Sequence, residues 1–197
     1  MAQSEWAEQT VSRIARTIRE VRGGRSTQWL ADRTKELGHP ISRVAISNLE
    51  VGRKSGVDVA DLVILARALE VPPMMLIYPD LMDGPVEVFP EQVVSSFEAQ
   101  KWFAGEWIPN PRVPLDEESD PDAWQEHMRL LDAMQKVDMA RGYSDAKIRL
   151  QSLERRISAP DVPRDEAREL EGIAMDYRNQ IAALAARMRS LGMVLDD

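Results

Sequence analysis

The chain has 197 residues but no cysteine, only two histidines and only three phenylalanines. Without cysteine it can form neither a disulfide nor a thiolate metal site, and nothing in the composition points to secretion. His39 and His127 have no further cysteine or histidine at ligand spacing, so we expect no metal site. The first residues lack the cationic and then apolar pattern of a signal peptide. We therefore expect a cytoplasmic protein.

Long apolar runs and catalytic motifs are also missing. The longest apolar stretch, from Val71 to Tyr78, contains two prolines and is far too short to span a bilayer, so we expect no membrane association. The sequence has no His-Glu-x-x-His motif, no phosphate-binding loop and no Gly-x-Ser-x-Gly motif. We expect that the protein is not an enzyme, with no catalytic residues and no cofactor.

The net charge of −8 hides a strong sorting of charge along the chain. Residues 13–54 hold ten Lys and Arg against four Asp and Glu, whereas residues 79–126 hold two against twelve. Residues 127–197 hold twelve of each sign. An acidic total therefore does not exclude a basic face that binds nucleic acid near the start of the chain. The acidic stretch is either a solvated linker or a surface that binds a partner or mimics DNA.

Apolar spacing predicts a compact all-helical unit over the first 78 residues. Helical periodicity runs through residues 8–22, and Gly23-Gly24 ends it. Ser26 is expected to cap a second helix, Ser42 a third over residues 43–50, and Asp58 a fourth. Val71-Pro72-Pro73 ends the fourth helix, and a last helical turn is expected at residues 74–78.

The third of these helices has the build of a helix that enters the DNA major groove. On a 3.6-residue repeat Ile46 and Leu49 face the core. The outward stripe consists of small or polar residues and one cation: Arg43, Val44, Ser47 and Asn48. Arg53 and Lys54 follow the helix, so that cations stand at both of its ends. This pattern is typical of a recognition helix.

The rest of the chain divides into an irregular segment and a helical hairpin. Residues 79–120 are acidic and rich in proline, with an edge strand expected at residues 85–90, a helix at residues 93–107 and a flexible linker from Pro109. The aromatic cluster of Phe97, Trp102, Phe103 and Trp107 is expected to be a small satellite core or a protein interface.

Residues 121–197 show the periodicity of a coiled coil. One helix is expected to run from Pro121 to about Arg141, where Gly142 interrupts it. Two heptad sets follow, at residues 143–157 and 167–191, separated by a loop at residues 158–163. The loop is short enough for an antiparallel hairpin, which can be either intramolecular or a dimerising element.

The first 78 residues resemble the XRE family, the lambda-repressor-like helix-turn-helix DNA-binding domains. The matching segments are Ile18 to Arg22, Leu30-Ala31, Ile41-Ser42-Arg43 with Glu50 to Arg53, and Leu62 to Pro72. Two further segments, residues 87–90 and 99–106, resemble actinobacterial and phage-derived members. The resemblance implies a bacterial or phage protein that associates with the nucleoid when it binds DNA. The stretch from Arg22 to Ser26 is shorter than in the family, and that from Ala31 to Ser42 is longer by about one helical turn.

The resemblance also implies roles for residues. In the family, the residues matched by Arg22 and Glu50 pair and brace the first helix against the recognition helix. Arg43 either reads guanine or contacts a phosphate, Asn48 bonds adenine or a phosphate, and Val44 and Ala45 either touch thymine methyl groups or pack. The remaining expected DNA contacts, several of which are phosphate contacts or caps, are Ser26, Thr27, Gln28, Ser42, Ser47, Arg53 and Lys54. Arg25 either contacts phosphate or is an ordinary surface charge.

Taken together, the sequence predicts an all-α protein with three parts. These are a lambda-repressor-like helix-turn-helix domain at residues 1–78, an irregular acidic segment at 79–120 and a coiled-coil-like hairpin at 121–197. The expected function is a sequence-specific transcriptional regulator, a repressor, that binds double-stranded DNA as a homodimer. The alternative is a protein-interaction module or antitoxin-like autoregulator, in which the acidic segment and the hairpin bind a partner protein.

Overall fold

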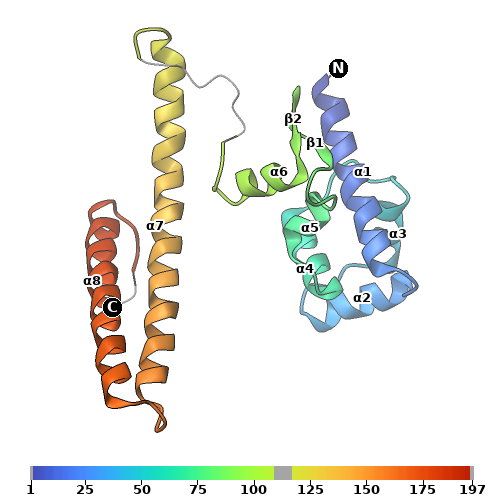
Figure 1. Ribbon diagram of the computed structural model, residues 1–197. Coiled ribbons are helices and arrows are strands. Elements are labelled where there is room, and N and C mark those ends of the chain that lie inside the picture. The colour runs from blue at the N-terminus through green and yellow to red at the C-terminus, as the bar shows by residue number, and fades with distance from the viewer. Residues whose placement is uncertain (1, 109–116, 196–197) are drawn as a thin grey trace. The chain divides into compact units, whose positions relative to one another are not determined.

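The computed structural model describes residues 2–108 and 117–195 and is mostly helical. It forms two compact units, Met1–Pro109 and Asn110–Asp197 (Figure 1). Residues 79–108 thus belong to the same unit as the first 78 residues, whereas the sequence assigned them to a separate segment. The linker expected from Pro109 lies mainly outside the described residues. None of the helices in the described ranges is long and apolar enough to cross a membrane.

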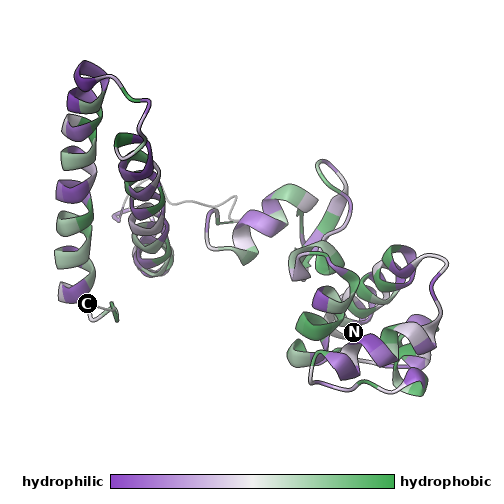
Figure 2. Ribbon diagram, turned by 90° about the horizontal axis from the view of Figure 1, so that it is seen from below, coloured by the Kyte–Doolittle hydropathy of each residue, from purple (hydrophilic) through white to green (hydrophobic). Residues whose placement is uncertain are grey.

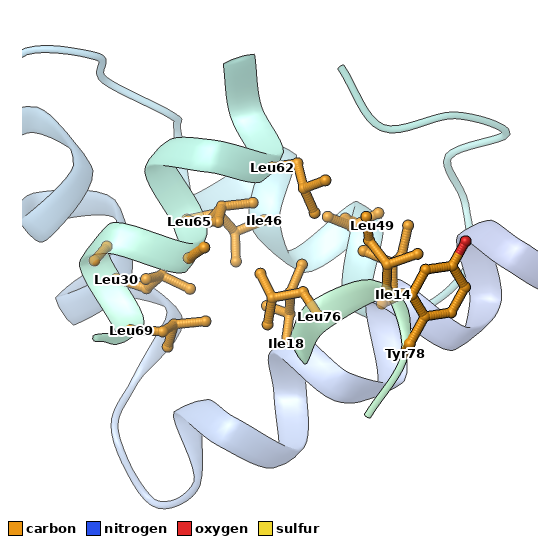
Figure 3. Close-up of a cluster of buried hydrophobic side chains, with 14 of the residues drawn as sticks. Ile14, Ile18, Leu30, Ile46, Leu49, Leu62, Leu65, Leu69, Leu76 and Tyr78 are labelled. Carbon is orange, nitrogen blue, oxygen red and sulfur yellow. The ribbon is translucent and has the colours of Figure 1, made fainter. Parts of the chain in front are cut away.

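Five helices make up most of the first unit: α1 (Ala2–Arg22), α2 (Thr27–Glu36), α3 (Arg43–Glu50), α4 (Val59–Leu69) and α5 (Pro73–Ile77). They bury one apolar core, in which Ile18, Leu30 and Leu76 are fully buried (Figure 3). Ile46 of α3 and Leu65 of α4 lie in the same core. Burial of each such side chain stabilises the fold by about 1.5–3 kcal/mol.

The short helices begin where the sequence predicts, because hydroxyl and carboxylate side chains cap them. Ser26 accepts a hydrogen bond from the Trp29 amide, and Asp58 accepts one from the Ala60 amide at 2.7 Å. These bonds satisfy amides that lack a partner in the first turn of a helix. Helix α1 begins earlier than the expected residue 8, at Ala2.

A β-hairpin and a sixth helix complete this unit. Strand β1 (Pro85–Phe89) pairs antiparallel with β2 (Gln92–Ser95), and α6 (Ser96–Phe103) follows directly. Val86 and Val88 of β1 are buried in the core of the unit. The expected strand at residues 85–90 is present, but the expected helix at 93–107 is wrong at both ends. The first residues of the expected helix, from Val93, instead form part of β2 and pair with β1.

A capping box sets the start of α6. The Ser95 hydroxyl accepts from the Glu98 amide, and the Ser95 amide donates to the Glu98 carboxylate at 3.0 Å. This bond lowers the pKa of Glu98, because it favours the charged carboxylate. The helix therefore begins after Ser95 rather than at Val93.

The second unit is an antiparallel hairpin of two long helices, α7 (Pro121–Ile157) and α8 (Arg164–Ser190). Both helices carry hydrophobic and hydrophilic residues in alternating blocks (Figure 2). The seam between the helices buries mainly small or flexible side chains: Met139, Ala146, Ala174, Ala185 and Met188. Polar contacts cross it at its rim, including a 2.8 Å ion pair between Arg178 and Glu154.

The expected interruption at Gly142 is wrong, because α7 continues through it without a break. A Cβ at this position would lie 3.9 Å from Leu184 Cδ1, an ordinary contact distance. Gly142 therefore keeps the helical conformation of the residues on both sides of it. A methyl group at this position would fit beside Leu184.

Replacing Gly142 with alanine should raise the free energy of unfolding of the hairpin by about 1 kcal/mol, since alanine has the higher helix propensity. Urea unfolding followed by circular dichroism measures the change. Gly192→Ala is the matched control, because Gly192 has a left-handed φ of 72° and alanine there should destabilise. A loss of stability in Gly142→Ala would contradict the continuous helix.

Candidate nucleic-acid interface

Helix α3 is short, and both of its ends are closed by local hydrogen bonds. At its start the Ser42 hydroxyl accepts from the Ala45 amide at 3.1 Å. At its end Gly52 adopts a left-handed φ of 72°, its amide donates to Leu49 O, and the Arg53 amide donates to Asn48 O at 2.8 Å. This is a Schellman motif, and it explains why a glycine stands at this position. The motif also fixes where the chain leaves the helix.

The outward face of α3 is a mixture of apolar and polar side chains. Val44 is 67% exposed, Arg43 is exposed, and Ser47 and Asn48 are half-buried. Ala45 is half-buried and packs against the core. Of the two roles that were expected for Ala45, a thymine contact or packing, this position agrees with packing. A face of this kind offers hydrogen-bonding groups and methyl groups together, which are the groups that read base edges.

Val51, which the sequence reasoning missed, belongs to the same face. It is 59% exposed at the carboxyl end of α3. The spacing 44, 47, 48, 51 places it on the outward stripe one turn beyond Asn48. The sequence already shows this spacing. Val51 was not assigned to the outward stripe because the helix was expected to end at Glu50.

A buried ion pair holds α3 against α1. Arg22 Nε donates to Glu50 Oε1 at 2.7 Å, and Arg22 Nη2 donates to Glu50 Oε2 at 2.8 Å. The two side chains are only 13% and 6% exposed. The hydrogen bond that Arg22 donates to the Glu50 carboxylate raises the pKa of Arg22, because it favours the charged guanidinium. Two parallel bonds between planar groups fix the relative orientation of the helices as well as their contact.

A second set of bonds fixes the connection between α2 and α3. The buried Thr34 hydroxyl donates to Ala31 O at 2.9 Å and accepts from the Ile41 amide at 3.0 Å. On the other side of the loop, His39 Nε2 and Asp61 Oδ1 lie 3.0 Å apart and tie the loop to α4. The connection from Ala31 to Ser42 is therefore anchored at two points despite its length.

The start of α2 presents the other expected contacts. Ser26 is exposed and serves as the helix cap, and Thr27 and Gln28 follow in the first turn. The side-chain amide of Gln28 donates from Nε2 to Asp32 Oδ1 at 2.8 Å within the same helix. A phosphate contact from Gln28 would have to replace that bond.

The cations near α3 fall into two groups. Arg25 is held in place: its guanidinium donates to Val21 O and Arg22 O and lies 4.2 Å from the centroid of the Trp29 ring. Among the described residues, by contrast, Arg43 and Arg53 make no side-chain hydrogen bond or ion pair. Lys54 is half-buried beside Arg53. Arg43 and Arg53, at opposite ends of α3, are thus available to an anionic ligand.

Other site classes find little support in the described ranges. No group of three or more His, Cys, Asp or Glu side chains there could hold a metal ion. Trp29 packs against the core, and Trp6 donates from its indole to Glu87 O at 2.9 Å. Both tryptophans are thus engaged in contacts within the first unit.

No family model matches this chain, and searches against curated proteins and against solved structures return no match.

Replacing Glu50 with glutamine should destabilise the first unit by about 3 kcal/mol, because it leaves the buried Arg22 guanidinium without a counter-charge. Thermal or urea unfolding measures the loss. Glu36→Gln is the control, since Glu36 is 64% exposed and pairs with Arg33 within one helix, a contact that contributes little. Equal effects of the two substitutions would contradict the bracing role.

Proposed function

We propose that residues 1–78 form a lambda-repressor-like helix-turn-helix domain and that the protein is a sequence-specific DNA-binding transcriptional regulator. The observation that carries the proposal is the build of α3. Its outward face is mixed and accessible, unpaired arginines stand at both ends, and the Arg22–Glu50 pair ties the last turn of the helix to α1. The helix has the width and the groups that the major groove admits.

The residues of this surface divide into base contacts and phosphate contacts. We assign Arg43 to guanine, which a guanidinium can contact through two bonds, and Asn48 to adenine. Val44 and Val51 are suited to thymine methyl groups. Phosphate contacts are assigned to the hydroxyls, amide and cations around the helix: Ser26, Thr27, Gln28, Ser42, Ser47, Arg53 and Lys54.

We further propose that the regulator binds as a homodimer and represses by occupying its operator. A two-fold axis would place two copies of α3 in successive major grooves, about 34 Å apart. The operator is then an inverted repeat, since the symmetry of the site mirrors that of the protein.

Selection of bound duplexes from a random pool should enrich one inverted repeat. On that duplex Arg43→Ala should weaken binding by about 1–3 kcal/mol and relax selection at one base pair of each half-site. Arg53→Ala should weaken binding to selected and unrelated duplexes alike, because phosphate contacts carry no sequence information. Fluorescence anisotropy at fixed salt measures both.

Arg16→Ala is a suitable control. Arg16 of α1 forms ion pairs with Glu20 of the same helix and with Asp80, and it is distant from α3 in the sequence. It should leave both affinities within twofold of the parent. A pool that shows no enriched sequence would contradict sequence-specific recognition, and equal behaviour of Arg43→Ala and Arg53→Ala would contradict the division of roles.

A partner protein is the second candidate, and the surface of residues 79–106 favours it. All three phenylalanines of the chain, Phe89, Phe97 and Phe103, are 37–59% exposed there. For Phe97 and Phe103 this exposure favours the protein interface among the two alternatives that the sequence left open for the aromatic cluster. Six carboxylates and one lysine accompany them. Exposed aromatic residues rimmed by charge are typical of protein-binding surfaces.

Phe97→Ser tests this second candidate. Phe97 is 44% exposed, with Lys101 Nζ 5.8 Å from the centroid of its ring, so the substitution should leave the fold intact. A protein that binds the parent chain and is lost from the variant, while DNA affinity stays the same, would support the module. Unchanged capture of every bound protein would count against it.

A further inference from the structure

The seam between α7 and α8 continues along α7 beyond the end of α8. Leu184 lies opposite Gly142 in the antiparallel pair. Six helical residues remain in α8 after Leu184, so its last residue reaches only about residue 136 of α7. Figure 1 shows the same mismatch in length, with the amino-terminal part of α7 extending past α8. We call this extension, residues 121–135, the α7 overhang.

The end of α8 is fixed and does not cover the overhang. Gly192 has a left-handed φ of 72°, and the Met193 amide donates back to Met188 O at 3.0 Å. This capping motif reverses the direction of the chain after Leu191. The helix that covers Met139 and Ala146 of α7 therefore stops before the same stripe reaches the overhang.

Beyond the polar Gln135, the uncovered part of the stripe is apolar. Counting back from the seam residue Met139 in steps of four, four, three and four residues leads to Gln135, Leu131, Met128 and Trp124. Leu131 is 41% exposed and Met128 is 46% exposed, and Trp124 is half-buried. These large apolar side chains occupy seam positions but have no helix facing them. Exposed apolar patches of this kind often mark interaction surfaces.

We propose that the α7 overhang of a second copy of this chain covers this stripe, with the two overhangs packed antiparallel about a two-fold axis near Met128. In that register Trp124 faces the partner's Leu131 and the two Met128 side chains meet at the axis. The contact extends the stripe of the existing α7–α8 seam along the same helix. This inference deepens the homodimer of the proposed function, although its geometry rests on the hairpin alone.

Charge favours a second copy at this surface. The overhang carries three carboxylates and one cation, a net charge of −2, so two copies meet there with less repulsion than at the other exposed apolar region. The other exposed apolar region, residues 79–106, carries six carboxylates against one lysine, and an isologous contact there would bring like charges together. The overhang is thus the more suitable of the two for self-association.

The size of the contact sets the strength of the dimer. Two helices that touch along about 15 residues share roughly 22 Å of length, which is a small interface. We therefore expect a weak dimer in solution, strengthened when both copies bind one DNA duplex and their effective concentration rises.

The absence of cysteine allows a direct test. Met128→Cys introduces the only thiol of the chain, and under mild oxidation it should give a disulfide-linked dimer at least tenfold faster than Met175→Cys. Met175 is the matched control, because it is 53% exposed on α8 at a position outside the heptad stripe. Non-reducing gel electrophoresis of the full chain, without DNA, measures both rates.

Met128→Asp and Met175→Asp provide a second readout that does not depend on a thiol. Sedimentation equilibrium should show that the dimer fraction falls at least fivefold in Met128→Asp and is unchanged in Met175→Asp, with helix content equal in both. Equal cross-linking rates, or an unchanged dimer fraction in Met128→Asp, would overturn the inference. Protection of the Met128→Cys thiol in a monomer would also overturn it, since another part of the same chain would then cover the stripe. None of these results decides whether the protein binds DNA, which the duplex selection tests separately.

Discussion

The paired bonds between Arg22 and Glu50 connect the end of α1 to the end of α3, and the candidate interface depends on them. Glu50 stands in the last turn of α3, where a negative charge is unfavourable with respect to the helix dipole. The Arg22 guanidinium offsets this cost through bonds of 2.7 and 2.8 Å. A buried pair is weak evidence for net stability, but its loss is costly and its geometry is specific. The orientation of α3, and so the direction in which Arg43 and Asn48 point, follows from this contact.

The two units use apolar burial in different ways. The first encloses Ile18, Leu30 and Leu76 completely, so that its helices are fixed relative to one another and can hold a recognition surface in place. The hairpin buries little more than a single seam, and it leaves side chains such as Met128 without a facing helix. A rigid core suits a surface that must match a ligand in shape, whereas an incomplete seam suits assembly. The excess of cations is confined to residues 13–54, which lie within the first unit.

Local signals predicted the helical class and most helix starts well, because Ser26, Ser42 and Asp58 act within one turn of themselves. Errors arose where the outcome depended on distant residues. Gly142 is a helix breaker by propensity, yet it lies within the continuous helix α7, opposite Leu184 of α8, and Val93 is paired with Glu87 in a strand. The outward stripe of α3 was predicted from periodicity, except for Val51. The engagement of Arg25 with Trp29 and of Gln28 with Asp32 depends on rotamers that spacing does not determine.

The most direct measurement of the central claim is a map of backbone amide chemical shifts in the full chain as a selected DNA duplex is added. The largest changes should lie at residues 26–28 and 42–54, with Arg43 and Asn48 among the most affected. The Glu50 amide signal should stay sharp, because the brace to Arg22 holds α3 in one orientation. Changes concentrated in residues 79–108 or in α7 and α8, with α3 unaffected, would contradict the assignment of α3 as the DNA-reading helix.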